Sequence, residues 1–79
     1  MNVKIRFFAM SRELAGTKEQ MWTLPDEATV EDLQAQLFAR WPALQTQRAR
    51  FAVNMAYASL TTVLHADDEV ACIPPVGGG

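Results

Sequence analysis

One long helix with a single apolar stripe is the feature that most limits the folds open to this chain. Residues 29–41, TVEDLQAQLFARW, place apolar side chains at the spacing of one helix face, with Phe38 beside them: Val30, Leu33, Leu37 and Trp41. Thr29 is expected to cap the N-terminus of this helix, and Pro42 is expected to end it. A single stripe can be buried only against another layer of structure, so we expect the helix to lie across one face of a sheet.

Two strands are predicted before the helix. Residues 2–9, NVKIRFFA, alternate between an apolar side and a more polar side, which is the period of a strand. Residues 17–24, TKEQMWTL, predict a second strand. Between the two, Ser11 is expected to cap a short helical turn, and Gly16 is expected to end that turn in a left-handed conformation.

Further strands are predicted after the helix. Residues 43–50, ALQTQRAR, are polar and are expected to form a connection. Phe51 and Val53 then alternate before a turn at Asn54, and residues 69–73, EVACI, predict a last strand.

The order strand, strand, helix, strands predicts an α+β fold. The simplest arrangement is a ubiquitin-like β-grasp, a mixed sheet with one main helix packed on one face. A right-handed crossover through the helix would place the first and last strands side by side and parallel. A chain of 79 residues leaves no room for a second domain. We therefore expect residues 1–73 to form the β-grasp domain and residues 74–79 to form an extended tail that ends in Gly-Gly.

The composition excludes several classes of function. The net charge is −2, and no basic patch is interleaved with aromatic residues, so we expect no nucleic-acid partner. No apolar stretch approaches the roughly 20 residues of a membrane span, and the N-terminal residues lack the apolar core of a signal peptide. A single cysteine, Cys72, excludes an internal disulfide and fits a reducing, cytoplasmic location. His65 is the only histidine, which disfavours a zinc site or a catalytic Cys-His pair, so we expect no metal site. We also expect that the chain binds no cofactor.

The tail, PPVGGG, contains three of the four glycines of the chain. Pro74 and Pro75 favour an extended path away from the domain, and Val76 can anchor it. Gly77, Gly78 and Gly79 have no Cβ, so they can pass through a channel that is too narrow for other residues. Glycine-rich chain ends also occur without a function. Here the concentration of glycine directly after PPV favours a tail that enters another enzyme, with the carboxylate of Gly79 as a group that ATP can activate.

Two motifs near the ends of the chain resemble one family. RFFAMSRELAG and DDEVACIPPVGGG are similar to the corresponding segments of molybdopterin synthase small subunits, which are ubiquitin-like sulfur carriers. The resemblance covers essentially the whole chain. Members usually have glycine where this chain has Asp67. Aspartate tolerates a left-handed backbone better than most residues, so we expect the turn to be kept.

The resemblance implies a function in molybdenum cofactor biosynthesis. An ATP-dependent adenylating enzyme would activate the carboxylate of Gly79, and sulfur transfer would convert it into a thiocarboxylate. Residues 74–78 would thread the tail into the large catalytic subunit of a molybdopterin synthase, where the sulfur is donated to a pterin precursor. The chain would thus be the sulfur-donating, non-catalytic subunit of a heteromeric complex. ATP would be used by the activating partner rather than bound by this chain.

Two other functions stay open. One is a sulfur carrier for thiazole formation in thiamin synthesis. The other is a ubiquitin-like binding or modifier domain, whose tail is either joined to lysines or idle. The FFA…RELAG start and the PPV before the glycines favour the molybdopterin synthase subunit.

A partner surface is predicted on the side of the sheet away from the helix. Phe8 and Ile73 are at outward positions of neighbouring strands, and Tyr57 can join them in an apolar patch beside the tail. Arg12 is a candidate for a polar contact with a partner, although it also fits an exposed helical turn. Cys72 is expected on the core face, as a small hydrophobic residue rather than a persulfide carrier.

Overall fold

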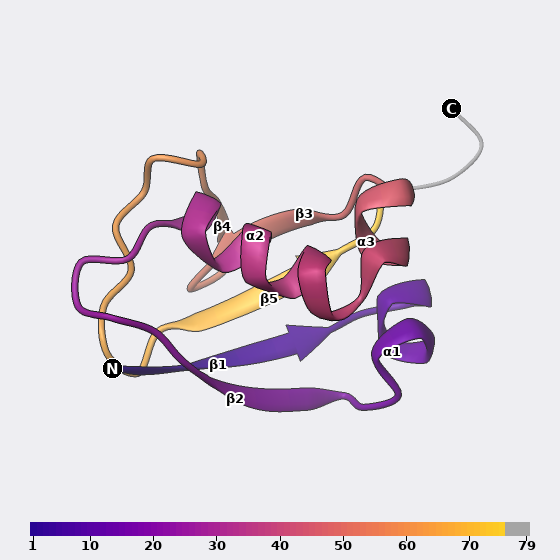
Figure 1. The fold of residues 1–79 in the computed structure, drawn as a ribbon, viewed down its shortest axis with the longest axis horizontal. Helices are drawn as coiled ribbons and strands as arrows, with labels where there is room; N and C mark the ends of the chain where they lie inside the picture. Colours follow the sequence, from indigo (N-terminus) through magenta and orange to yellow (C-terminus); the bar gives the residue numbers. More distant parts are fainter. Residues whose placement is uncertain (76–79) are drawn as a thin grey trace.

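The computed structural model describes residues 1–75 (Figure 1). Within this range five strands form one sheet in the order β2-β1-β5-β3-β4. The elements in chain order are β1 (Asn2–Phe7), α1 (Met10–Ala15), β2 (Glu19–Thr23), α2 (Val30–Arg40), α3 (Pro42–Thr46), β3 (Arg50–Val53), β4 (Ala56–Tyr57) and β5 (Glu69–Ile73). β1 and β5 are parallel neighbours, and the other neighbouring pairs are antiparallel. The mixed sheet of a β-grasp is therefore confirmed, with the first and last strands side by side.

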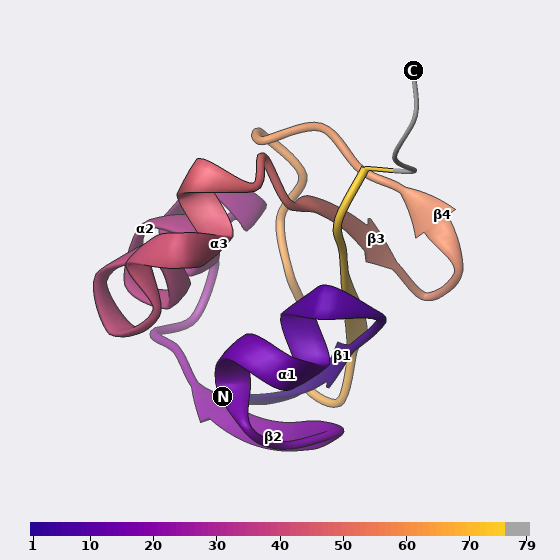
Figure 2. The same cartoon turned by 90° about the vertical axis from the view of Figure 1, so that its right-hand side faces the viewer.

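The core lies between the sheet and the helices α2 and α3, which cover one face of it (Figure 2). The predicted stripe of α2 is buried, because Val30, Leu33 and Leu37 are at most 1% exposed. Thr29 caps the helix as expected: its hydroxyl accepts a hydrogen bond from the Asp32 N–H, and the Asp32 carboxylate accepts one from the Thr29 N–H. On the opposite face of the sheet no helix of residues 1–75 is packed, so this face is open.

The prediction that residues 43–50 form only a polar connection is wrong, because the first part of this range belongs to the helix α3. Pro42 does end α2, but it also occupies the first turn of α3. Proline is favoured there because its fixed φ suits a helix and its missing N–H would have no helical partner. Leu44 is completely buried, which anchors α3 against the core despite its polar neighbours.

The turn between β1 and β2 also differs from the expectation. It forms α1, and its N-terminal cap is Ala9 rather than Ser11, with no side-chain capping bond. Ser11 is one residue inside the helix and completely buried. Gly16 ends α1 with φ 76°, the left-handed conformation that was predicted. Asp67 likewise has φ 68°, so the turn before β5 is kept without glycine.

Candidate functional site

The open face of the sheet is organised by the register of four strands. Arg6 of β1 is opposite Ala71 of β5, Ala71 is opposite Ala52 of β3, and Ala52 is opposite Tyr57 of β4. Directly opposed residues point to the same side of a sheet. These four residues therefore form a row across the open face, with two alanines at its centre.

A hollow of about 410 Å³ lies along this row. The two alanines, Ala52 and Ala71, have small side chains, which leave a space between larger neighbours. The complete lining is Arg6, Phe8, Ala52, Met55, Tyr57, Glu69, Ala71 and Ile73. A mainly apolar hollow with polar groups at its edge suits an apolar side chain of a protein partner.

The two aromatic residues of the hollow are each flanked by an arginine. The Arg6 guanidinium carbon lies 5.5 Å from the centroid of the Phe8 ring, and that of Arg50 lies 4.9 Å from the centroid of the Tyr57 ring. Cations at these distances are attracted to the ring faces. The arginines thus help to hold both rings in place.

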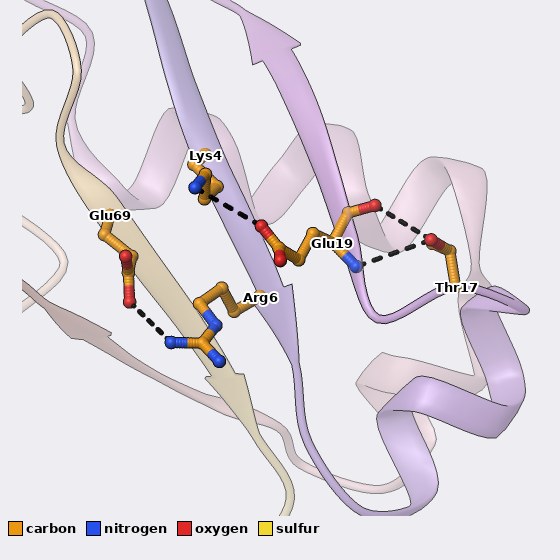
Figure 3. Close-up of polar contacts among 5 residues, drawn as sticks. All are labelled: Lys4, Arg6, Thr17, Glu19 and Glu69. Carbon is orange, nitrogen blue, oxygen red and sulfur yellow. Dashed lines mark hydrogen bonds and ion pairs between the residues drawn. The ribbon is translucent and has the colours of Figure 1, made fainter.

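Ion pairs continue the open face towards β2 (Figure 3). Arg6 Nη1 lies 3.1 Å from Glu69 Oε1, and Lys4 Nζ lies 3.3 Å from Glu19 Oε2. All four side chains are about half exposed, and exposed pairs of this kind stabilise a fold by only about 0–1 kcal/mol. Their clearer effect is to bound the apolar hollow with charge on one side.

Met55 lines the hollow from the two-residue turn between β3 and β4. Its φ is 73° and that of Asn54 is 48°, so both central residues are left-handed, as a type I′ turn requires. Glycine is the usual residue at the second of these positions. Here the position holds a methionine whose side chain is 96% exposed. An adaptable apolar side chain displayed on a strained backbone is suited to contact with a partner.

The tail begins beside the hollow. β5 ends at Ile73, which lines the hollow, and Pro74 and Pro75 follow it directly. The remaining predicted tail residues lie outside the described residues: Val76, Gly77, Gly78 and Gly79. The hollow therefore extends along β5 as far as Ile73, the residue after which the tail begins.

The structure brings together three of the four residues predicted for partner binding. Phe8, Tyr57 and Ile73 all line the hollow. Arg12 does not, because it lies on α1, where its Nε donates a long hydrogen bond of 3.5 Å to the Phe7 carbonyl oxygen. A partner contact by any of the four stays a prediction.

Sequence reasoning missed the residues that shape the hollow. Ala52 and Ala71 occupy outward strand positions, and small residues there could have indicated a depression, but only if the register had been known. Met55 follows Asn54 in the predicted turn, at a place where glycine is common. A large apolar residue at such a place is a signal that could have been recognised.

Cys72 is not part of this surface. Its side chain is completely buried on the core face, and burial raises the pKa of the thiol to about 11, against the opposing effect of a hydrogen bond with Ser11. The thiol is thus protonated and inaccessible near neutral pH, which disfavours a role as a sulfur nucleophile.

Among residues 1–75 no group of three or more metal-ligating side chains is present. None of the helices in the same range is long and apolar enough to cross a membrane.

The chain is similar in sequence and in fold to proteins of known family. The sequence model of the ThiS family matches residues 5–79. The molybdopterin synthase sulfur carrier subunit of Chlamydomonas reinhardtii is 45% identical, over 100% of both chains. That of Escherichia coli K12 is 41% identical, over 98% of this chain and 99% of the other. The crystal structure of SAMP1, a small archaeal modifier protein from Haloferax volcanii, superposes with a TM-score of 0.85 at 28% identity, over 100% of both chains.

Proposed function

Because the chain belongs to the ThiS family of ubiquitin-like sulfur carriers, we propose that it is the sulfur-carrier subunit of a molybdopterin synthase. The observation behind this proposal is the end-to-end similarity to two curated carrier subunits, at 45% and 41% identity. The first of these matches covers 100% of this chain, so it extends over both the folded domain and residues 74–79.

The reacting group in this proposal is the carboxylate of Gly79, the last residue of the sequence. An adenylating enzyme joins the carboxylate to the α-phosphorus of ATP, and pyrophosphate leaves. A sulfur nucleophile then displaces AMP from the acyl carbon, which leads to a thiocarboxylate. The carrier binds no cofactor of its own, and both partners work with it in the cytoplasm.

The open face is the docking surface in this proposal. The large catalytic subunit places an apolar side chain in the hollow between Phe8, Tyr57 and Ile73. Because Ile73 lines the hollow and Pro74 follows it, docking there holds the start of the tail against the partner. Gly77 and Gly78 then allow the tail to enter a narrow channel that leads to the pterin precursor.

The sulfur-transfer step is tested by intact mass spectrometry. The purified chain is incubated with ATP, a sulfide donor and an adenylating enzyme of this family, and the expected product has one oxygen replaced by sulfur. Deletion of Gly79, or addition of one residue after it, is expected to abolish the product. The reason is that the reacting atoms must approach within about 3–3.5 Å. Thermal melting is expected to be unchanged in both variants. An extended variant that acquires sulfur at the wild-type rate without trimming contradicts the proposal.

The docking step is tested separately by calorimetric titration against the large subunit. Phe8→Asp and Ile73→Asp are expected to weaken binding by about 30-fold or more, since charging a central apolar anchor costs about 2 kcal/mol or more. Met21→Asp is the matched control, because Met21 is an exposed residue of the open face that does not line the hollow. Equal affinity of all three variants and the wild type would exclude the hollow as the docking surface.

A modifier function is the second candidate, favoured by the structural similarity to SAMP1. In that case the activated Gly79 would be transferred to lysine amines rather than to sulfur. The mass experiment separates the two outcomes when cell extract replaces the sulfide donor, because conjugates appear as larger species. A carrier for thiazole formation would give the thiocarboxylate but would bind a thiazole synthase instead of the large subunit.

A further inference from the structure

Ser11 is the only polar residue among residues 1–75 whose side chain is fully buried. It lies in the first turn of α1, yet it does not cap that helix. Buried polar groups require hydrogen-bond partners, so the contacts of this hydroxyl show which parts of the chain it connects.

The hydroxyl connects the end of β1 with the end of β5. Ser11 Oγ accepts a hydrogen bond of 3.0 Å from the Phe8 N–H. It lies 2.9 Å from the Cys72 carbonyl oxygen and 2.6 Å from the Phe8 carbonyl oxygen, to which it can donate. A hydroxyl has one hydrogen, so these two carbonyl oxygens share a single donor.

The Cys72 carbonyl accepts the last hydrogen bonds that join β5 to the end of β1. It also accepts a hydrogen bond of 3.2 Å from the Phe8 N–H. Pro74 and Pro75 follow after one intervening residue, Ile73, and proline has no N–H with which to continue a strand ladder. The bonds at Cys72 are therefore the last that tie β5 to β1 before the tail begins.

A strained turn brings Ser11 into this position. Ala9, between Phe8 and Ser11, has φ 51° and ψ −128°, a combination that residues other than glycine rarely adopt. The Ser11 N–H also donates to the Phe8 carbonyl oxygen at 3.1 Å, which closes the turn. Strain of this kind persists only where the surrounding contacts fix it.

We propose that Ser11 is a positioning residue that clamps the end of β5 and so fixes the point from which the tail leaves the domain. This inference rests on the proposed sulfur-carrier function, in which the tail bears the reacting carboxylate. The Phe8 N–H donates to the clamped carbonyl and Ile73 is the next residue along the chain, so the clamp also fixes the start of the tail relative to the docking surface. Without it, a carrier bound to either partner, the adenylating enzyme or the large subunit, would present its carboxylate within reach of the reaction less often. Turnover should then fall while affinity is kept.

The experiment compares Ser11→Ala and Ser11→Cys with Val30→Ala. Ser11→Ala leaves no backbone group without a partner, because the Phe8 N–H still donates to the Cys72 carbonyl oxygen, so it should fold. Ser11→Cys keeps nearly the same volume but has only a weak donor. Val30→Ala lowers global stability through a buried residue of α2 and leaves the clamp untouched.

Two measurements are made on each variant. The first is amide hydrogen exchange at Cys72 and Ile73 in the isolated chain, which is expected to rise at least about 5-fold in both Ser11 variants relative to Val30→Ala, through local opening. The second is the kinetics of thiocarboxylate formation, where kcat is expected to fall about 3- to 10-fold with KM within about 2-fold of wild type.

Each outcome has a definite meaning. Exchange at Cys72 and Ile73 that is no faster in the Ser11 variants than in Val30→Ala overturns the clamp, whether or not the wild type acquires sulfur. Faster exchange with unchanged kcat overturns the positioning role. If the wild type itself forms no thiocarboxylate, the proposed function has failed, and the exchange measurement still decides whether Ser11 holds the end of β5.

Discussion

Replacement of Met55 by glycine is expected to stabilise the domain and to weaken its docking at the same time. Met55 has φ 73° and a side chain that is 96% exposed, and it lines the hollow of the open face. Its backbone conformation is unfavourable in the isolated domain, and its side chain makes almost no contact there. We therefore infer that the methionine is useful only when a partner covers the hollow.

The size of the stability effect follows from the backbone. A left-handed conformation costs a residue other than glycine about 1–2 kcal/mol. Glycine removes that cost but adds about 0.5–1 kcal/mol through its greater freedom in the unfolded chain. Because the side chain is exposed, almost no packing is lost. The net gain is about 0.5–1 kcal/mol, which in a domain of this size corresponds to a Tm rise of about 2–8 °C.

The assay pairs thermal melting with titration against the large subunit for Met55→Gly, Met55→Ala and Asn54→Gly. Met55→Ala removes the side chain but keeps the backbone strain, so its Tm should match that of the wild type. The affinity for the large subunit should fall about 2- to 10-fold in both Met55→Ala and Met55→Gly. Asn54 is also left-handed, but its amide bonds to Asp68 and to the Glu69 N–H. Asn54→Gly should therefore lower stability by about 1 kcal/mol.

Two results would refute this reasoning independently. A Met55→Gly domain that melts no higher than Met55→Ala would show that the turn is not strained at this residue. Wild-type affinity in both Met55 variants would show that the side chain takes no part in docking, even if the stability prediction is correct.

Three further predictions concern the folded domain. Leu33→Ala is expected to lower the free energy of unfolding by about 2–5 kcal/mol in a urea titration, because Leu33 is a completely buried residue of α2. Ala9→Gly is expected to raise it by about 0.5–2 kcal/mol through relief of the unusual backbone conformation, and an unchanged urea midpoint would contradict the strain. Burial raises the pKa of the Cys72 thiol to about 11 from an ordinary 9.0, so the folded state keeps a proton that the unfolded state loses. The resulting stabilisation is complete below pH 9 and is lost as the pH rises towards 11. A comparison of unfolding free energies at pH 8 and pH 11 should show a decline about 2–3 kcal/mol smaller in Cys72→Ala than in wild type.

The elements that could be predicted from the sequence are those whose signal is local. The stripe of α2 and the Thr29 cap are set by residues within one or two helical turns, and the alternation of β1 is set within eight residues. The parallel pairing of β1 and β5 also followed, because the handedness of a crossover leaves few arrangements for this order of elements. The position of Phe8 and Ile73 on one face needed only the period of a strand and that pairing.

Only the tertiary structure decided which residues meet across the open face and at the start of the tail. The hollow depends on the register that sets Ala52 opposite Ala71, and α3 depends on the burial of Leu44 in a polar segment. The bond from Ser11 to the Cys72 carbonyl joins residues 61 positions apart. Periodicity tells which side of an element is apolar, but it contains no information about the partner of that side. Strand register and long-range hydrogen bonds are fixed by the packing of the whole core, and so they appear only once the chain is folded.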